Sequence, residues 1–312
     1  MTTEGQGSSR YSGRQLGQDP GSARGIAAVT LGATAFSFAF IFVKVIGLPP
    51  ATLGFYKAII ATGVLGLVAL VLRAPLPKRF GPVLFAGVCF GLHQLIFISA
   101  TQKTSVAIVT MIGALKPLLI AVISPWTVGE RPAPRMKYLA LLAVAGIGVV
   151  VWANYGDPSR SLEGDLLAVL NLGVFTAFFL FAKRARASGT HTLTLTVSQN
   201  LIAALVLGPA MLFVTPIVPE APMQWWLLAL FALGPGSGHL LVNWAHPRIS
   251  AAFASLILNA VPILASFWAY LFLGEPYGVP HIVGMLAVLA AVELGRRAEI
   301  QNSRAQRDAQ SS

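Results

Sequence analysis

The sequence predicts an all-α membrane protein in which ten transmembrane helices form two inverted repeats of five helices each. Three observations support this fold class. Of the 312 residues, 55% are hydrophobic and only 11% are charged, whereas soluble domains usually carry about 25% charged residues. The apolar residues also fall into ten long runs, and the two halves of the chain resemble each other at a nearly constant offset.

The ten predicted spans follow from the lengths of these apolar runs. A helix that crosses a bilayer needs roughly 20 mostly apolar residues, and the runs are too long and too uniform for membrane strands. Short gaps rich in turn residues, such as GLPPAT and VGERPAPR, separate the runs. The predicted spans cover residues 26–46, 53–72, 80–99, 104–123, 137–154, 164–184, 193–214, 223–244, 249–272 and 280–297.

The orientation follows from the positions of the lysines and arginines. With the N-terminus in the cytoplasm, most of the 22 basic residues fall in inner loops and tails, while the outer loops hold only Lys103 and Arg160. Basic residues accumulate on the cytoplasmic side of membrane proteins. We therefore expect a multi-pass protein of the cell membrane with both termini in the cytoplasm. The same asymmetry accounts for the net charge of +11 without a nucleic-acid partner.

Five segments make up the predicted domain organisation. Both ends of the chain are polar and lack an apolar leader, which is typical of disordered tails. The segments are a cytoplasmic tail (1–24), a first repeat (25–154), an outer linker (155–163), a second repeat (164–297) and a second cytoplasmic tail (298–312).

The repeat is clearest in the fourth and ninth predicted spans. The stretch SVAIVTMIGALKPLLIAVIS aligns with SAAFASLILNAVPILASFWA at an offset of 145, so that Pro117 matches Pro262. Because each half has an odd number of spans, the second half enters the membrane from the opposite side. Inverted repeats are typical of secondary transporters; a duplication kept only for packing is the alternative.

The same stretches resemble the EamA type of the drug/metabolite transporter superfamily. The most specific pieces are TSVAIVTMIGALKPLLIAVISPWTVGERP and GHLLVNWAHPRISAAFASLILNAVPILASFWAYLFLGEP, and the resemblance covers nearly all of residues 25–298. It implies ten helices in a 5+5 arrangement and movement of small metabolites, often outward. Two residues depart from the family pattern: Lys57 stands where the second helix commonly carries arginine, and Lys116 is not expected before the proline.

Lys116 and Pro117 are the first candidate site. Lys116 lies near the predicted mid-depth of the membrane, where insertion of a lysine costs about 2.5–3.5 kcal/mol. Pro117 lacks an N–H and leaves a carbonyl free one turn earlier. This pair is tolerated if it faces a solvated cavity that binds a carboxylate or phosphate. The alternative is a structural ion pair between Lys116 and another group such as Glu293.

Further candidate contacts come from both halves. Lys44 and Lys57 lie in the outer thirds of their helices, where either can contact substrate or extend to the membrane surface. The glycine-rich LGPGSGH predicts a broken helix that lines the cavity or allows close packing. Polar residues at similar depth can contact substrate or serve packing. The remaining candidates are His93, Gln94, Gly236, His239, Ser255 and Asn259.

Glu293 is a weaker candidate for proton coupling. It lies in the last predicted span, near its inner end. Arg296, three residues further on, offers it an ion pair, which is the simpler interpretation.

The favoured function is a secondary-active transporter that moves a small polar metabolite, amino acid-like or anionic, outward by alternating access. A membrane-embedded enzyme acting on a lipid-linked substrate is the alternative, but its clustered acids and histidines are missing from the sequence. A receptor or scaffold is a third possibility. We expect no cofactor and no metal; the expected partners are the substrate and the lipid bilayer. The chain is expected to be a monomer or a homodimer.

Overall fold

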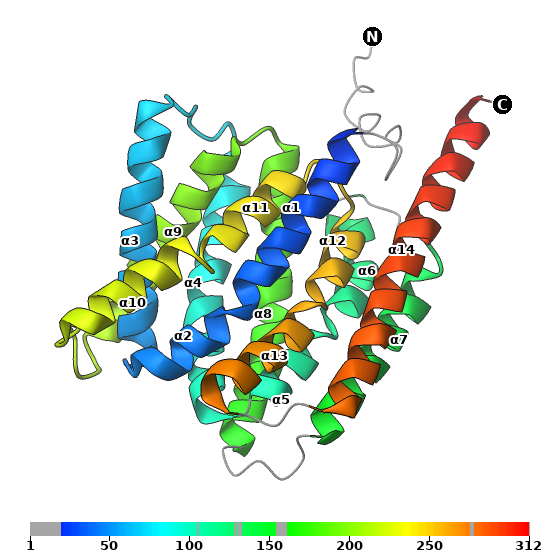
Figure 1. The fold of residues 1–312 in the computed structure, drawn as a ribbon. Helices are drawn as coiled ribbons and strands as arrows, with labels where there is room; N and C mark the ends of the chain where they lie inside the picture. Colours follow the sequence, from blue (N-terminus) through cyan, green and yellow to red (C-terminus); the bar gives the residue numbers. More distant parts are fainter. Residues whose placement is uncertain are drawn as a thin grey trace.

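The computed structural model describes residues 20–311, except for 105, 128, 130–132, 154–160 and 275–277. Within these ranges all regular elements are helices (Figure 1). They are α1 (Pro20–Ser37), α2 (Ala39–Ile46), α3 (Pro50–Val71), α4 (Phe80–Lys103), α5 (Val106–Gly113), α6 (Lys116–Thr127), α7 (Met136–Ala153), α8 (Leu162–Ala187), α9 (Thr192–Met211), α10 (Pro222–Leu233), α11 (Ser237–Ala245), α12 (Ala251–Leu258), α13 (Val261–Leu273) and α14 (Val279–Ser311).

Eight helical segments of the described chain are long and apolar enough to cross a bilayer. They are Ser22–Ile46, Pro50–Val71, Phe80–Lys103, Leu162–Ala187, Thr192–Met211, Pro222–Ala245, Ala251–Leu273 and Val279–Asn302. The two other predicted spans, 104–123 and 137–154, fall on the short helices α5 and α6 and on α7. The all-helical membrane architecture is therefore confirmed.

The ends of the chain differ from the predicted tails. Helix α1 already begins at Pro20, and α14 continues to Ser311 instead of ending near residue 297. The segment after residue 297 is rich in Ala, Gln and Arg, which are good helix formers, so the helix continues beyond the apolar stretch. Figure 1 shows the end of α14 extending beyond α12 and α6. Residues 1–19 and most of the predicted linker lie outside the described residues.

Two of the predicted spans are broken at equivalent positions by prolines. Pro117 cannot donate a hydrogen bond to the carbonyl of Gly113, and α5 ends at Gly113. Pro262 stands in the same relation to Leu258, the last residue of α12. The two breaks are 145 residues apart, which is the offset of the sequence repeat. The two helix breaks therefore fall at the same position of the sequence repeat.

Glycines mark a second equivalent pair of positions. Gly129 follows α6 and Gly274 follows α13, and their φ angles are 69° and 72°. Residues with a side chain rarely adopt this left-handed backbone conformation, so glycine is favoured at both positions. The local backbone of the two halves therefore agrees at the breaks and at the ends of these helices.

The predicted break in LGPGSGH is present between α10 and α11. Pro235 lies within it, and Gly236 N donates to the carbonyl of Phe231 at 3.0 Å, one residue further back than in an α-helix. A Cβ atom on Gly236 would lie 1.9 Å from the carbonyl oxygen of Ala232. Only glycine fits there, because real Cβ atoms do not approach backbone atoms so closely.

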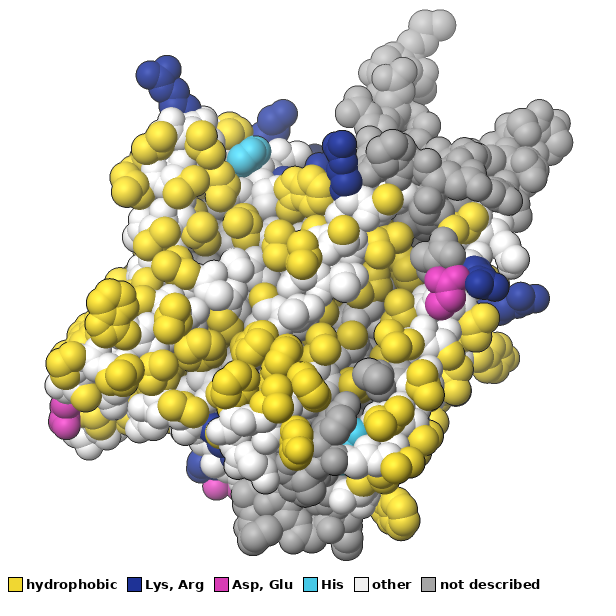
Figure 2. All heavy atoms as spheres, in the orientation of Figure 1, with side chains coloured by type: hydrophobic (Ala, Val, Ile, Leu, Met, Phe, Trp, Pro, Cys, Tyr) yellow, Lys and Arg dark blue, Asp and Glu magenta, His cyan; other side chains and the backbone are white. Residues whose placement is uncertain are grey.

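The outer surface combines an apolar body with basic residues at one end. Figure 2 shows hydrophobic side chains over the flanks of the helices, and several Lys and Arg side chains at the end of the molecule where α3 finishes and α1 begins. Large apolar side chains such as Leu70 and Leu205 are 77% and 68% exposed. An apolar surface of this extent is suited to contact with lipid and not with water.

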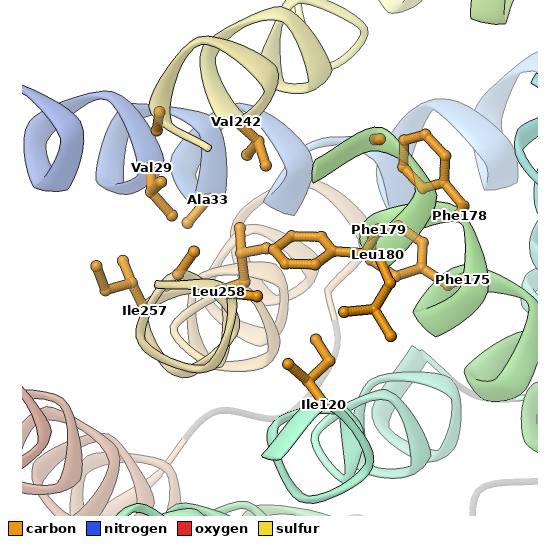
Figure 3. Close-up of a cluster of buried hydrophobic side chains, with 14 of the residues drawn as sticks. Val29, Ala33, Ile120, Phe175, Phe178, Phe179, Leu180, Val242, Ile257 and Leu258 are labelled. Carbon is orange, nitrogen blue, oxygen red and sulfur yellow. The ribbon is translucent and has the colours of Figure 1, made fainter. Parts of the chain in front are cut away.

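Long helix pairs hold the bundle together. Helix α4 packs along α8 and α9, α3 packs along α9, α7 along α14, and α1 along α11. A buried cluster fills the space where α1, α6, α8, α11 and α12 meet (Figure 3). It includes Val29, Ala33, Ile120, Phe178, Phe179, Val242 and Ile257.

Candidate substrate cavity

A cavity of about 110 Å³ lies at the centre of the bundle, where residues from both halves of the chain meet. It begins where the buried cluster of Figure 3 ends, since Phe175 and Leu258 belong to both. Its lining residues are Phe36, Ala39, Phe40, Lys57, His93, Gln94, Phe97, Val109, Thr110, Gly113, Ala114, Lys116, Asn171, Leu172, Phe175, Phe231, Pro235, His239, Leu258, Asn259, Val261 and Pro262.

Six of the predicted site residues line this cavity. They come from four different helices and from the break between α12 and α13, and they are Lys57, His93, Gln94, Lys116, His239 and Asn259. The sequence alone places Lys57 in the outer third of its helix and Lys116 near the middle of the membrane. The structure brings them to a common space.

Lys57 projects from α3 and is only 4% exposed. Its Nζ donates a hydrogen bond of 2.7 Å to Oε1 of Gln94 on α4. The same Nζ lies 4.8 Å from the ring centroid of Phe231 and 5.7 Å from that of Phe90. The ammonium group is therefore held by an amide oxygen and two aromatic rings, and not by a carboxylate.

Lys116 is the first residue of α6, directly after the break that Pro117 produces. Its Nζ lies 4.0 Å from the ring centroid of Phe175. No hydrogen bond or ion pair joins this Nζ to another of the described residues. A cation is unfavourable at a helix N-terminus, so an anion in the cavity would be attracted by both the helix end and the lysine.

Two histidines line the same cavity as the lysines. Nδ1 of His93 is 2.7 Å from Oδ1 of Asn171 on α8, so that Nδ1 carries the hydrogen and Nε2 is left for another partner. His239 is surrounded by Phe36, Phe90 and Phe178, with centroid distances of 4.5, 4.6 and 5.7 Å. The centroids of the two imidazoles are 6.4 Å apart.

Asn259 connects the two broken helices. Its Nδ2 donates to the carbonyl oxygen of Ala114 at 3.3 Å. This carbonyl belongs to the break between α5 and α6, and Asn259 belongs to the break between α12 and α13. The two residues are 145 apart, so they occupy the same place in the two halves.

Comparison with known proteins identifies the family. The model of the EamA-like transporter family matches residues 23–152 and again residues 162–294. This chain belongs to the EamA-like transporter family. The EamA-like chain is therefore a multi-pass membrane transporter of the drug/metabolite transporter superfamily, and not an enzyme.

Curated relatives of the EamA-like chain are named as exporters or transporters. The pseudopaline exporter CntI of Pseudomonas aeruginosa is 24% identical over 253 residues, which is 80% of this chain and 87% of the relative. The uncharacterized transporter YwfM of Bacillus subtilis is 22% identical and covers 80% of this chain and 88% of its own. A solved crystal structure has the same fold, with a TM-score of 0.72 and 19% identity over 89% of this chain and 98% of its own.

Five predicted site residues of the EamA-like transporter are not among the residues that line the cavity. Pro117 and Gly236 lie at helix breaks, directly after the lining residues Lys116 and Pro235. Ser255 is fully buried and donates to the carbonyl of Ala252 at 2.8 Å, so its hydroxyl is occupied within its own helix.

Lys44 and Glu293 lie elsewhere. Lys44 lines a second hollow beside Pro49 and Gln102, and its Nζ is 3.4 Å from the carbonyl oxygen of Thr104. Glu293 accepts a hydrogen bond of 2.7 Å from Nε of Arg297, one turn further along α14. The expected partner was Arg296, whose side chain lies outside the described part. The geometry of Glu293 matches the structural interpretation and not its pairing with Lys116.

Sequence reasoning missed several lining residues of the EamA-like transporter. Asn171 is the single amide in the apolar stretch LLAVLNLGVF, and such an isolated polar residue in a membrane span indicates a position that faces the protein interior. Phe36, Phe40, Phe97, Phe175 and Phe231 gave no signal, because membrane helices carry phenylalanine on every face. In the described part of the chain, no group of three or more His, Cys, Asp or Glu residues could hold a metal ion.

Proposed function

We propose that this EamA-like transporter moves a small polar metabolite, amino acid-like or anionic, out of the cell by alternating access around the central cavity. The observation that carries the proposal is the pair of lysines, Lys57 and Lys116, in a cavity whose described lining residues include no carboxylate. An intramembrane ionisable residue is costly and usually functional. A carboxylate or phosphate on the substrate would supply the missing opposite charge.

The proposal includes ten spans in two inverted repeats. The family model matches once in each half, and the broken helices and the left-handed glycines recur at an offset of 145. Equivalent helices also pack in equivalent ways, since α4 lies along α8 as α11 lies along α1. Two such halves can exchange conformations, which exposes one central site to each side in turn.

The proposed boundaries of these repeats are residues 25–154 and 164–297. The basic end of the molecule is assigned to the cytoplasm of the cell, together with both termini, because of the lysine and arginine asymmetry. One chain encloses a cavity by itself, so a monomer is sufficient for transport, and a homodimer would carry one cavity in each subunit. No P-loop occurs in the sequence, so a gradient of substrate or ions drives the movement.

An uptake screen in proteoliposomes tests the function. Amino acids, small carboxylates and phosphorylated sugars are offered to vesicles that contain the parent protein or Lys116→Ala, and the solute is recovered to show that it is unchanged. We expect flux of at least one of these classes, reduced at least about tenfold by the substitution because a charged contact is lost. A variant that keeps the rate and selectivity of the parent would refute the role of Lys116.

A further inference from the structure

We propose that the substrate carries two anionic groups joined by a short linker, one group for Lys57 and one for Lys116. This inference rests on the proposed transport function and names the substrate class of the same cavity. Each lysine binds one anionic group, and the aromatic side chains of the cavity contact the linker.

Charge balance in the cavity is the first argument. The described lining residues bring two ammonium groups and no carboxylate to the same small space. Buried charges are stable when they are paired with opposite charges. A single carboxylate would leave one ammonium without a counter-charge, whereas a dianion would balance both.

The separation of the two lysines is the second argument. Lys57 lies near the ring of Phe90, and Lys116 lies over the ring of Phe175. The imidazole of His93 neighbours both of these rings, with centroids 6.2 Å from Phe90 and 4.5 Å from Phe175. The two ammonium groups therefore contact different aromatic rings of the cavity, and we assign each of them an anion of its own.

The donors available to each anion are also distinct. Nζ of Lys57 already donates one hydrogen bond to Gln94 and keeps two further hydrogens. Nζ of Lys116 has no hydrogen-bond partner among the described residues and lies at the start of α6, where the helix end adds its partial positive charge. Both lysines therefore offer charged donors to a carboxylate.

The size and lining of the cavity fit a small dianion with an apolar middle. The cavity measures about 110 Å³, and a single water needs about 10–15 Å³ on this measure, so that several non-hydrogen atoms can be accommodated. Phe36, Phe40 and Phe97 supply apolar contacts. A chain of a few methylene groups between two carboxylates has the required properties.

Binding of three matched probes by titration calorimetry tests this inference. The probes are glutarate, pentanoate and 1,5-diaminopentane, which share a five-carbon skeleton but carry two negative charges, one negative charge or two positive charges. We expect the Kd of glutarate to be at least about tenfold lower than that of pentanoate, the usual effect of one charged hydrogen bond. We expect no binding of the diamine.

Variants separate the two ends. Gln94→Glu places a carboxylate beside Lys57 and should abolish the preference for glutarate over pentanoate, while Lys57→Arg should retain it because the charge remains. Lys116→Gln should also abolish the preference. Lys137→Gln is the control, since Lys137 is exposed beside Tyr138 on α7 and does not line the cavity. Size-exclusion profiles confirm that each variant is folded.

Three outcomes overturn the inference: equal Kd values for glutarate and pentanoate, tighter binding of the diamine, or no binding of succinate, glutarate or adipate at millimolar concentration. A preference for glutarate that survives Gln94→Glu also contradicts it. Flux of monoanions in proteoliposomes without a preference for dianions refutes the substrate class and leaves the transport function intact. Preferential binding of dianions without any flux refutes the transport function and leaves the binding site intact.

Discussion

The hydrogen bond between Lys57 and Gln94 gives the most direct test of the energetics of the cavity. The two atoms are 2.7 Å apart, and the residues are 4% and 3% exposed. Substitution Gln94→Leu keeps the approximate volume of the side chain but removes the only hydrogen-bond acceptor that the described residues give to the Lys57 ammonium. A hydrogen bond to a charged group contributes about 1.5–3 kcal/mol to stability. We therefore expect the variant to lose about 2 kcal/mol of unfolding free energy.

A double-mutant cycle isolates this contact. Lys57→Met removes the charge, so Gln94→Leu made in that background should cost much less than in the parent. The expected coupling energy is about 2 kcal/mol, measured by equilibrium unfolding in mixed detergent micelles. Gln102→Leu is a matched control, because its Nε2 donates a neutral bond of 2.9 Å to the carbonyl of Leu48, which is worth about 0.5–1.5 kcal/mol.

Two results would refute this reasoning. If Gln94→Leu were as stable as the parent, the ammonium would not depend on the amide oxygen. If the two substitutions were additive, the measured losses would come from packing and not from the hydrogen bond.

Four other predictions concern the helix break, the histidine, the acid on α14 and the topology. Gly236→Ala should sharply reduce the yield of folded protein, since its Cβ would lie 1.9 Å from the carbonyl oxygen of Ala232; normal yield and melting temperature would contradict this. Asn171→Leu should lower uptake several-fold because His93 loses its partner, and Asn171→Asp should restore the orientation of the ring and part of the rate. Glu293→Gln should leave the response of uptake to a pH gradient unchanged, given the bond to Arg297; loss of the response would make Glu293 a coupling residue. In a Cys89→Ser background, the single substitutions Arg135→Cys and Pro280→Cys should react with membrane-impermeant reagents from opposite sides, and labelling from the same side would refute the inverted topology.

Much of the fold could be predicted because its causes are local in the sequence. Lipid requires long apolar runs, and proline breaks a helix at a defined distance, so the ends of α5 and α12 follow from Pro117 and Pro262 alone. The glycine-rich break before α11 could be predicted for the same reason. The continuation of α14 to Ser311 was less evident, because a polar segment with high helix propensity can be either a helix or a disordered tail.

The candidate site could be predicted less completely because it depends on the direction of each side chain. Depth along a helix placed His93 and His239 near the same level and Lys57 nearer the outer side, and all three line the cavity. Depth alone could not show that Ser255 is enclosed or that Lys44 lines a separate hollow. Rotation about each helix axis is set by packing, which also decides which phenylalanines face the cavity.

If the proposed alternating access operates, the contact between Asn259 and Ala114 has a consequence for the resting preference of the unloaded protein. An identical pair of residues at this place would contribute equally to the two exchanged states. Here one half supplies an amide and the other a methyl group and a carbonyl oxygen, so a single bond of 3.3 Å has no counterpart in the exchanged arrangement. A neutral bond of about 0.5–1.5 kcal/mol would favour one orientation of the unloaded protein by roughly two- to tenfold.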